Sequence, residues 1–208
     1  AGEYLAKKPM RSDVRSVFRA ARPLAAPKEG HTMTKEISRS HRVIVSESNL
    51  VSIVGGKWTT FRKMGADTVK AFTRVTGSPL PEISTPVDRL HGYTTEKKGH
   101  FSSYGSDAAA IEALAAERPE WAEKLHPDHP YIVAEIIWAV RNEMAVTVED
   151  VLSRRIRLLI LDALAATEVA PKVAAVMAEE LGENGTWIES RLSSFAKTAA
   201  VHTITQHE

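Results

Sequence analysis

The sequence contains no cysteine among its 208 residues. This absence excludes disulfides, thiolate metal ligands and cysteine nucleophiles, and it fits a reducing compartment. An excess of one charge is also lacking: 27 basic residues face 26 acidic ones, so we expect no nucleic-acid partner. The longest apolar runs, Ile132–Val140 and Leu158–Ala166, are interrupted by Glu135 and Asp162 and are too short to span a bilayer. We therefore expect no transmembrane helix, whereas peripheral attachment to a membrane stays open.

Residues 1–85 have the composition of a strand-rich segment. Val14–Ala20 alternates in part between apolar and polar residues, Glu36–Val45 ends in a β-branched run, and Leu50–Val54 is a short apolar strand. The polar residues Ser46–Asn49 between the last two predict a hairpin loop.

The hydrophobic period changes after the second strand. From Phe61 to Val75 apolar residues recur every three or four positions, which predicts an amphipathic helix that ends near Gly77–Pro79. Gly65 lies inside this helix, where it weakens the helix relative to alanine, and we interpret it as a sign of close packing on a strand.

The stretch 86–104 is polar and rich in glycine and turn residues, which predicts a linker. Residues 105–208 then carry helical patterns almost throughout, and we expect about five helices in a compact bundle. The fold class is therefore α+β, with a strand-rich domain over 1–85, a linker over 86–104 and an all-α domain over 105–208.

Several helix ends of the second half carry recognisable signals. Thr147–Asp150 resembles a capping box that opens a helix to about Ala166. Thr167 is a candidate cap for the next helix, which Gly182 ends. Thr186–Glu189 repeats the capping-box pattern and predicts a last helix to about residue 200.

The stretch Ser52–Arg62 is the most informative part of the chain. It predicts a buried strand, a turn formed by Gly55 and Gly56, and the first turn of a helix. Paired glycines let the backbone approach a ligand closely, and a helix start offers unpaired N–H groups to an anion or to a ring that gains negative charge. Many strand–helix turns carry glycine for packing alone, so this element leaves a purely structural role open.

Cations gather near the predicted strand ends, among them Arg22, Arg39 and Lys57. Two arginine forks and a lysine point charge that converge from three strand ends suit a small phosphorylated substrate. Spacing alone favours the alternative that they are solvated cations at strand edges.

Other candidate side chains carry weaker signals. His41 and His31 have the chemistry of general bases, but an isolated loop histidine more often has no catalytic role. The remaining histidines lack metal-ligand spacing, so we expect no metal site. Arg154, Arg155 and Arg157 follow Asp150 and form either an anion or membrane-surface patch or, more in keeping with the spacing, a salt-bridge network that joins helices.

Taken together, four stretches resemble the C-terminal part of FAD-dependent glycerol-3-phosphate dehydrogenase, a membrane-associated respiratory enzyme. They occur in the family's order, and the likeness extends from about residue 12 to about residue 166. The stretches are Ala21–Leu24, Ile37–Arg39, Val54–Lys63 and Asn142–Arg155.

The resemblance implies roles for individual residues. Arg22 and Arg39 match arginines that hold the substrate phosphate, and Lys57 matches a catalytic lysine close to both flavin and substrate. The cofactor-binding turn that approaches the flavin ring is matched by Gly55, Gly56, Lys57, Trp58, Thr59 and Thr60. In the family, hydride passes from glycerol 3-phosphate to FAD, dihydroxyacetone phosphate is formed, and electrons go to a quinone. The helical half resembles the family's cap domain, which supplies no recognised catalytic residue.

One departure from the family pattern is decisive. The sequence has no Gly-x-Gly-x-x-Gly, the fingerprint that holds the pyrophosphate of a dinucleotide. The chain therefore looks like a fragment that starts inside the flavoprotein domain. We expect the fragment alone to be inactive and not to retain FAD, and we expect its exposed strand edge to favour a homodimer, strand swapping or partial disorder.

Two other functions stay open at this stage. One is a glycerol-3-phosphate oxidase that passes electrons to oxygen, and the other is a non-catalytic helical module that docks on a partner or a membrane. The resemblance implies a cytoplasmic protein whose parent enzyme is peripheral on the cytoplasmic face of the inner membrane.

Overall fold

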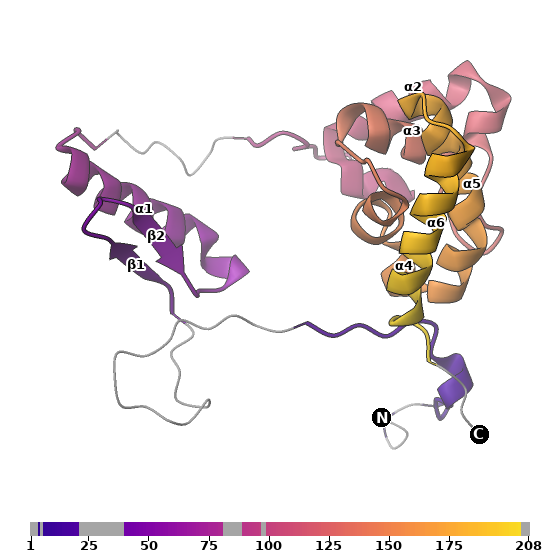
Figure 1. Ribbon diagram of the computed structural model, residues 1–208, viewed down its shortest axis with the longest axis horizontal. Helices are drawn as coiled ribbons and strands as arrows, with labels where there is room; N and C mark the ends of the chain where they lie inside the picture. The colour runs from indigo at the N-terminus through magenta and orange to yellow at the C-terminus, as the bar shows by residue number, and fades with distance from the viewer. Residues whose placement is uncertain (1–3, 5, 21–39, 81–88, 97–98, 205–208) are drawn as a thin grey trace. The chain divides into compact units, whose positions relative to one another are not determined.

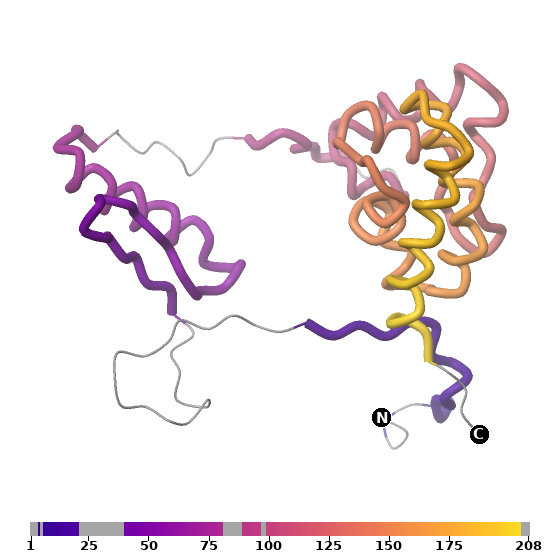
Figure 2. Tube along the Cα trace, viewed as in Figure 1, coloured from indigo at the N-terminus to yellow at the C-terminus, as the bar shows by residue number. Residues whose placement is uncertain are grey.

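The structure is a computed structural model, and it describes residue 4 and residues 6–20, 40–80, 89–96 and 99–204. The chain divides into two compact units. Residues 20–88 form one unit, which we call the hairpin unit, and residues 1–19 and 89–208 form the other, the helical unit. Figure 1 shows the labelled elements of each unit, and Figure 2 traces the same chain as a tube.

The hairpin unit consists of a β-hairpin and one helix. Strands β1 (Arg42–Val45) and β2 (Val51–Val54) pair in antiparallel register, with Val43 opposite Ile53. Between them the N–H of Asn49 donates to the carbonyl of Ser46 at 2.9 Å, which confirms the predicted hairpin loop. Helix α1 (Phe61–Thr76) lies along the hairpin and contacts both strands. It ends at Gly77, which has φ +68°, so the predicted helix and its end are confirmed.

Very little of the hairpin unit is buried. Within residues 40–80, Thr73 is the only buried side chain, so β2 is not the buried strand that the sequence predicted. Large apolar side chains stay exposed, including Trp58 at 87% and Phe61 at 57%. Gly65 does not mark close packing, as its sequence context suggested, because a Cβ built there would meet no atom within 4 Å.

The helical unit contains five α-helices in its described residues, as the sequence predicted. They are α2 (Ala108–Glu117), α3 (Val133–Asn142), α4 (Leu158–Leu161), α5 (Ala163–Leu181) and α6 (Gly185–Ala200). Helix α5 packs against α3, α4 and α6, and α2 packs against α3. Short 3₁₀ turns at Arg11–Asp13, Gly99–Asp107 and Pro119–Ala122 complete the described elements of the unit.

The apolar core of this unit lies between its helices. Its largest fully buried side chains come from four helices and from the segment before α4: Ile111, Ile136, Ile137, Val148, Val151, Leu152, Leu158, Leu159, Val173 and Met177. Together with the small sheet, these helices confirm the predicted α+β class. None of the helices in the described residues is long and apolar enough to cross a membrane.

The helix predicted from Thr147 to about Ala166 is interrupted. The capping box forms, since the hydroxyl of Thr147 donates to Asp150 Oδ2 at 2.8 Å and the N–H of Asp150 donates back to that hydroxyl at 3.1 Å. The following turn, Asp150–Arg155, widens to π geometry, and the N–H of Ile156 donates to the carbonyl of Val151. Arg157 then adopts a left-handed backbone with φ +59°, which breaks the helix.

Two other predicted caps are wrong. Thr167 lies inside α5, and the N-cap of α5 is Asp162, whose carboxylate accepts from the N–H of Ala165 at 3.1 Å. Helix α6 is capped by Asn184 rather than by Thr186, and the N–H of Trp187 donates to the Asn184 side chain at 3.2 Å. In both cases the helix begins a few positions earlier than predicted, so its free N–H groups lie next to another residue. Gly182 ends α5 as predicted.

The segment Val14–Ala20 forms no strand, contrary to its alternating pattern. Its hydrogen bonds are isolated: Arg15 accepts from the N–H of Ala163 at 3.1 Å, and the N–H of Val17 donates to the carbonyl of His202 at 2.9 Å. These bonds attach the segment to the helical unit, whereas the sequence-based division placed it in the domain over 1–85.

Candidate functional site

The Gly-Gly turn of the hairpin unit has the geometry that the sequence predicts. Strand β2 ends at Val54, and Gly55 and Gly56 follow with φ +75° and +89°, a region that residues with a Cβ rarely adopt. Lys57 is extended, and its carbonyl accepts from both the N–H and the hydroxyl of Thr60 at 2.9 Å. The chain thus passes from strand to helix through a 3₁₀ turn at Trp58–Thr60.

Gly56 is also required by the packing of the unit itself. A Cβ at this position would lie 2.6 Å from Sδ of Met64 and 3.1 Å from Cβ of His41. The structural and the ligand-binding explanations of this glycine therefore do not exclude each other.

Replacing Gly56 with alanine is expected to destabilise the hairpin unit by about 2 kcal/mol, from the left-handed backbone and the contact with Met64. Gly65→Ala is the matched control, because that position is helical and open, and we expect it to stabilise α1 by about 0.5–1 kcal/mol. Amide hydrogen exchange of β1 and β2 in the full chain measures both effects. Equal protection of the two strands in the two variants would contradict the packing role of Gly56.

Lys57 lies between two cavities. One, of about 580 Å³, is mostly apolar and is lined by Ile53, Gly55, Gly56, Lys57, Trp58, Phe61, Met64, Gly65, Thr68 and Val69. The other, of about 480 Å³, is polar and is lined by Ser40, His41, Lys57, Thr60, Lys63 and Asp67. Among the described residues the Lys57 ammonium has no hydrogen-bond or ion-pair partner, so it is available to a ligand in either cavity.

The polar cavity contains a charged cluster of His41, Lys63 and Asp67. Asp67 Oδ2 lies 2.8 Å from His41 Nε2 and 3.0 Å from Lys63 Nζ. The Lys63 ammonium, followed by the His41 ring, lowers the pKa of the Asp67 carboxyl. Asp67 therefore holds the His41 ring in place and neutralises Lys63, which leaves Lys57 as the cation without a described partner in this cavity.

Sequence reasoning missed Asp67 and Lys63. Their i, i+4 spacing on α1 was a usable sign of a local ion pair, but their proximity to His41, 26 residues away from Asp67, arises only from the fold. Arg22, Arg39 and His31 lie outside the described residues. Among the candidate residues the structure thus brings together Lys57 with Gly55, Gly56, Trp58 and Thr60, and it sets His41 across the polar cavity.

No group of three or more potential metal ligands occurs in the described part of the chain. The arginines after Asp150 form the expected network in part. Arg154 contacts Glu149 at 2.6 Å and Asp150 at 3.0 Å, which confirms the i, i+4 pair. Arg155 donates to the carbonyl of Glu143 and lies 3.8 Å from its carboxylate.

Comparisons with known proteins agree on one family. The family model of the C-terminal domain of alpha-glycerophosphate oxidase matches residues 46–188, which include parts of both units. A probable mitochondrial glycerol-3-phosphate dehydrogenase of Caenorhabditis elegans is 33% identical over 93% of this chain and 31% of its own length. The mitochondrial glycerol-3-phosphate dehydrogenases of Rattus norvegicus and Homo sapiens are 35% and 34% identical, over 91% and 82% of this chain and 28% and 26% of their own lengths. The chain thus spans less than a third of these curated relatives.

Proposed function

The chain belongs to the family of the C-terminal domain of alpha-glycerophosphate oxidase, and we propose that it is the C-terminal part of an FAD-dependent enzyme that oxidises glycerol 3-phosphate to dihydroxyacetone phosphate. The observation that carries this proposal is the turn at Gly55–Lys57. There, a glycine backbone that a ligand can approach closely, a cation without a partner among the described residues and an apolar cavity occur together. A docking module has no need of this combination.

The residues of the turn fit a flavin ring. Positive φ values at Gly55 and Gly56 keep side chains away from the backbone, and the adjoining cavity has aromatic and aliphatic walls from Trp58, Phe61 and Ile53. Such a cavity suits a flat, largely apolar ring with a few polar atoms. When bound, FAD supplies the group that accepts hydride from the substrate carbon. The fingerprint for its pyrophosphate is absent from the sequence, so other residues hold that part of the cofactor.

The cations of the chain have separate tasks in this proposal. Lys57 stabilises negative charge that develops beside the turn, because its ammonium borders both cavities. Arg22 and Arg39 hold the substrate phosphate, since arginine forks bind phosphate oxygens bidentately. Arg39 directly precedes Ser40, which lines the polar cavity, and this adjacency supports a phosphate position on that side of Lys57.

The electron acceptor in this proposal is a quinone. The relatives are named dehydrogenases, which favours an acceptor other than oxygen, whereas the family model is named after an oxidase. We further propose that the enzyme associates peripherally with the cytoplasmic face of the inner membrane, where a quinone is reached. The relatives' names describe mitochondrial proteins, which is compatible with a membrane-bound quinone pool.

Steady-state turnover tests the proposed reaction and its acceptor. The protein expressed from the complete reading frame that encodes this chain is expected to form dihydroxyacetone phosphate from glycerol 3-phosphate with a soluble quinone analogue. Turnover that instead produces hydrogen peroxide in stoichiometric amounts would make the enzyme an oxidase. Absence of dihydroxyacetone phosphate with either acceptor would contradict the proposal.

The 208-residue chain by itself is expected neither to retain FAD through gel filtration nor to oxidise glycerol 3-phosphate. The reason is that a dinucleotide without its pyrophosphate fingerprint is held by the ring contacts alone. Visible absorbance of the eluted protein, compared with that of the complete-frame protein as control, measures flavin content. Stoichiometric flavin together with turnover by the isolated chain would refute this expectation.

A further inference from the structure

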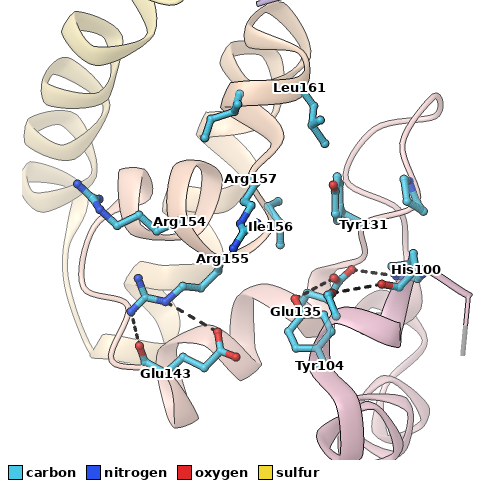
Figure 3. A pocket seen from close by; sticks show the side chains of 13 residues that line it. His100, Tyr104, Tyr131, Glu135, Glu143, Arg154, Arg155, Ile156, Arg157 and Leu161 are labelled. Atoms are coloured by element: carbon cyan, nitrogen blue, oxygen red, sulfur yellow. Dashed lines mark hydrogen bonds and ion pairs between the residues drawn. The ribbon is translucent and has the colours of Figure 1, made fainter. Parts of the chain in front are cut away.

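The helical unit contains a further cavity, whose lining residues are remote in sequence from the Gly-Gly turn. Its volume is about 830 Å³, within the range of small-molecule sites. Figure 3 shows Arg155, Ile156 and Arg157 on one side of it, and His100, Tyr104, Tyr131 and Glu135 on the other.

The basic side of the cavity has one cation without a described partner. Arg154 is paired with Glu149 and Asp150, and Arg155 is held by Glu143, so these two charges are neutralised locally. The guanidinium of Arg157 has no hydrogen bond or ion pair with any residue in the described ranges, and the side chain is exposed to solvent. Its charge is therefore available to a molecule in the cavity.

The backbone conformation fixes the position from which the Arg157 side chain extends. The π turn of Asp150–Arg155 and the left-handed φ of +59° at Arg157 place this residue at the break between that turn and α4. Bulky residues rarely adopt this conformation. The position would accept glycine without change of the backbone, which makes the arginine side chain itself the feature to explain.

The opposite side of the cavity does not supply an anion that pairs with Arg157. Glu135 is only 1% exposed and accepts hydrogen bonds from the N–H of Ile132 at 2.8 Å, the hydroxyl of Tyr104 at 2.9 Å and Nε2 of His100 at 3.3 Å. Burial raises the pKa of the Glu135 carboxyl. Its acceptor capacity is thus satisfied within the helical unit, and Tyr131 and His100 line the cavity beside it.

Apart from Ser103, the rest of the lining is apolar. Pro130, Ile156, Ile160 and Leu161 border the cavity, and Leu161 is 56% exposed although Leu158 and Leu159 of the same helix are buried. A ligand that fits both kinds of wall carries an anionic head and a partly apolar body.

We propose that this cavity binds a small molecule with an oxyanion head, a phosphate or a carboxylate, which the guanidinium of Arg157 holds. The arginine fork matches both kinds of head bidentately, and the apolar body lies against Tyr131 and Ile160. The site lies wholly within the helical unit, so it does not depend on the proposed oxidation of glycerol 3-phosphate.

Calorimetric titration of the 208-residue chain with phenyl phosphate, benzoate and benzamide at constant ionic strength tests the site. We expect at least one of the two anions to bind and the neutral benzamide not to bind. Stronger binding of phenyl phosphate would identify a phosphate head, and stronger binding of benzoate a carboxylate head. Amide chemical shifts should change around Tyr131 and Arg157.

Arg157→Gly is the decisive variant, because glycine keeps the left-handed backbone and removes the guanidinium. We expect the affinity for the anion to fall roughly 10- to 100-fold while the thermal midpoint is unchanged or raised. Arg141→Ala is the matched control and should leave the affinity within about two-fold, since that arginine does not line the cavity and is paired with Glu180. No binding of either anion, or equal affinity in Arg157→Gly and the parent chain, would overturn the proposal.

Discussion

Replacing Lys57 with methionine is expected to lower the kcat of glycerol 3-phosphate oxidation by about 100- to 1,000-fold in the complete enzyme. Methionine is similar in length but carries no charge. The ammonium of Lys57 borders both cavities of the hairpin unit and has no partner among the described residues, so its loss removes the cation that stabilises developing negative charge there. Stopped-flow reduction of the flavin measures the effect on the chemical step.

The control for this variant is Lys70→Met, which lies on α1 of the same unit but outside both cavities beside Lys57. It should change kcat by less than about two-fold, because an exposed charge at that distance is screened by solvent. Flavin content should stay the same in both variants, since Gly55 and Gly56 are retained. Equal activity of Lys57→Met and the parent enzyme would remove Lys57 from the site.

Replacing Asp162 with alanine is expected to destabilise the helical unit by about 2–3 kcal/mol. The carboxylate is 2% exposed, caps α5 through the N–H of Ala165, and contacts Arg15 Nη1 at 2.6 Å and His129 Nε2 at 3.4 Å. Its loss leaves free N–H groups at the start of α5 and releases the segment that Arg15 attaches. Urea denaturation followed by circular dichroism measures the change.

Asp162→Asn separates the cap from the charge. Asparagine caps helices about as well as aspartate, so this variant should lose only about 1 kcal/mol. Asp128→Asn, a change of an exposed carboxylate in the same region, should leave stability unchanged. If Asp162→Ala were no less stable than Asp128→Asn, the capping role would be wrong.

The same residue gives a pH dependence with a definite sign. Burial alone would raise the pKa of the Asp162 carboxyl, but the N–H of Ala165 and the Arg15 guanidinium outweigh burial and lower it. The unfolded chain therefore binds more protons than the folded chain as pH falls. The contribution of Asp162 is present above about pH 4 and is lost as pH falls through the lower pKa of the folded state. Asp162→Asn should flatten this part of the stability curve.

Local sequence signals predicted the elements around the candidate site well. The β-branched runs predicted the hairpin, the paired glycines predicted the strand-to-helix turn, and Gly77 predicted the end of α1. Each of these depends on backbone preferences of neighbouring residues, which a sequence displays directly.

Features that depend on distant contacts were not predicted. The break at Arg157 follows a π turn whose geometry is set by packing, and the alternation of Val14–Ala20 gave no sign that its backbone bonds go to Ala163 and His202. The clustering of Glu135 with Tyr104, 31 residues away, likewise arises only from the fold. Resemblance supplied roles for Lys57, Arg22 and Arg39, whereas Asp67 became visible only as a neighbour of a cavity. The sequence placed Arg157 in a basic cluster but left open whether that cluster binds an anion or joins helices.

The described residues of the hairpin unit form almost no apolar core of their own. Its described residues bury almost no apolar side chain, and Trp58 and Phe61 stack at 5.8 Å while largely exposed. A unit with so small a core depends on surfaces beyond itself for stability. The exposed rings beside the Gly-Gly turn are consistent with the proposed flavin contact.

The most direct test of the central claim is an anaerobic titration of the complete-frame protein with glycerol 3-phosphate, monitored by the visible absorbance of bound flavin. The account predicts that absorbance is lost in proportion to the glycerol 3-phosphate added, that dihydroxyacetone phosphate appears in equal amount, and that Lys57→Met slows the loss. A purified protein that binds no flavin, or flavin that glycerol 3-phosphate does not bleach, would contradict it.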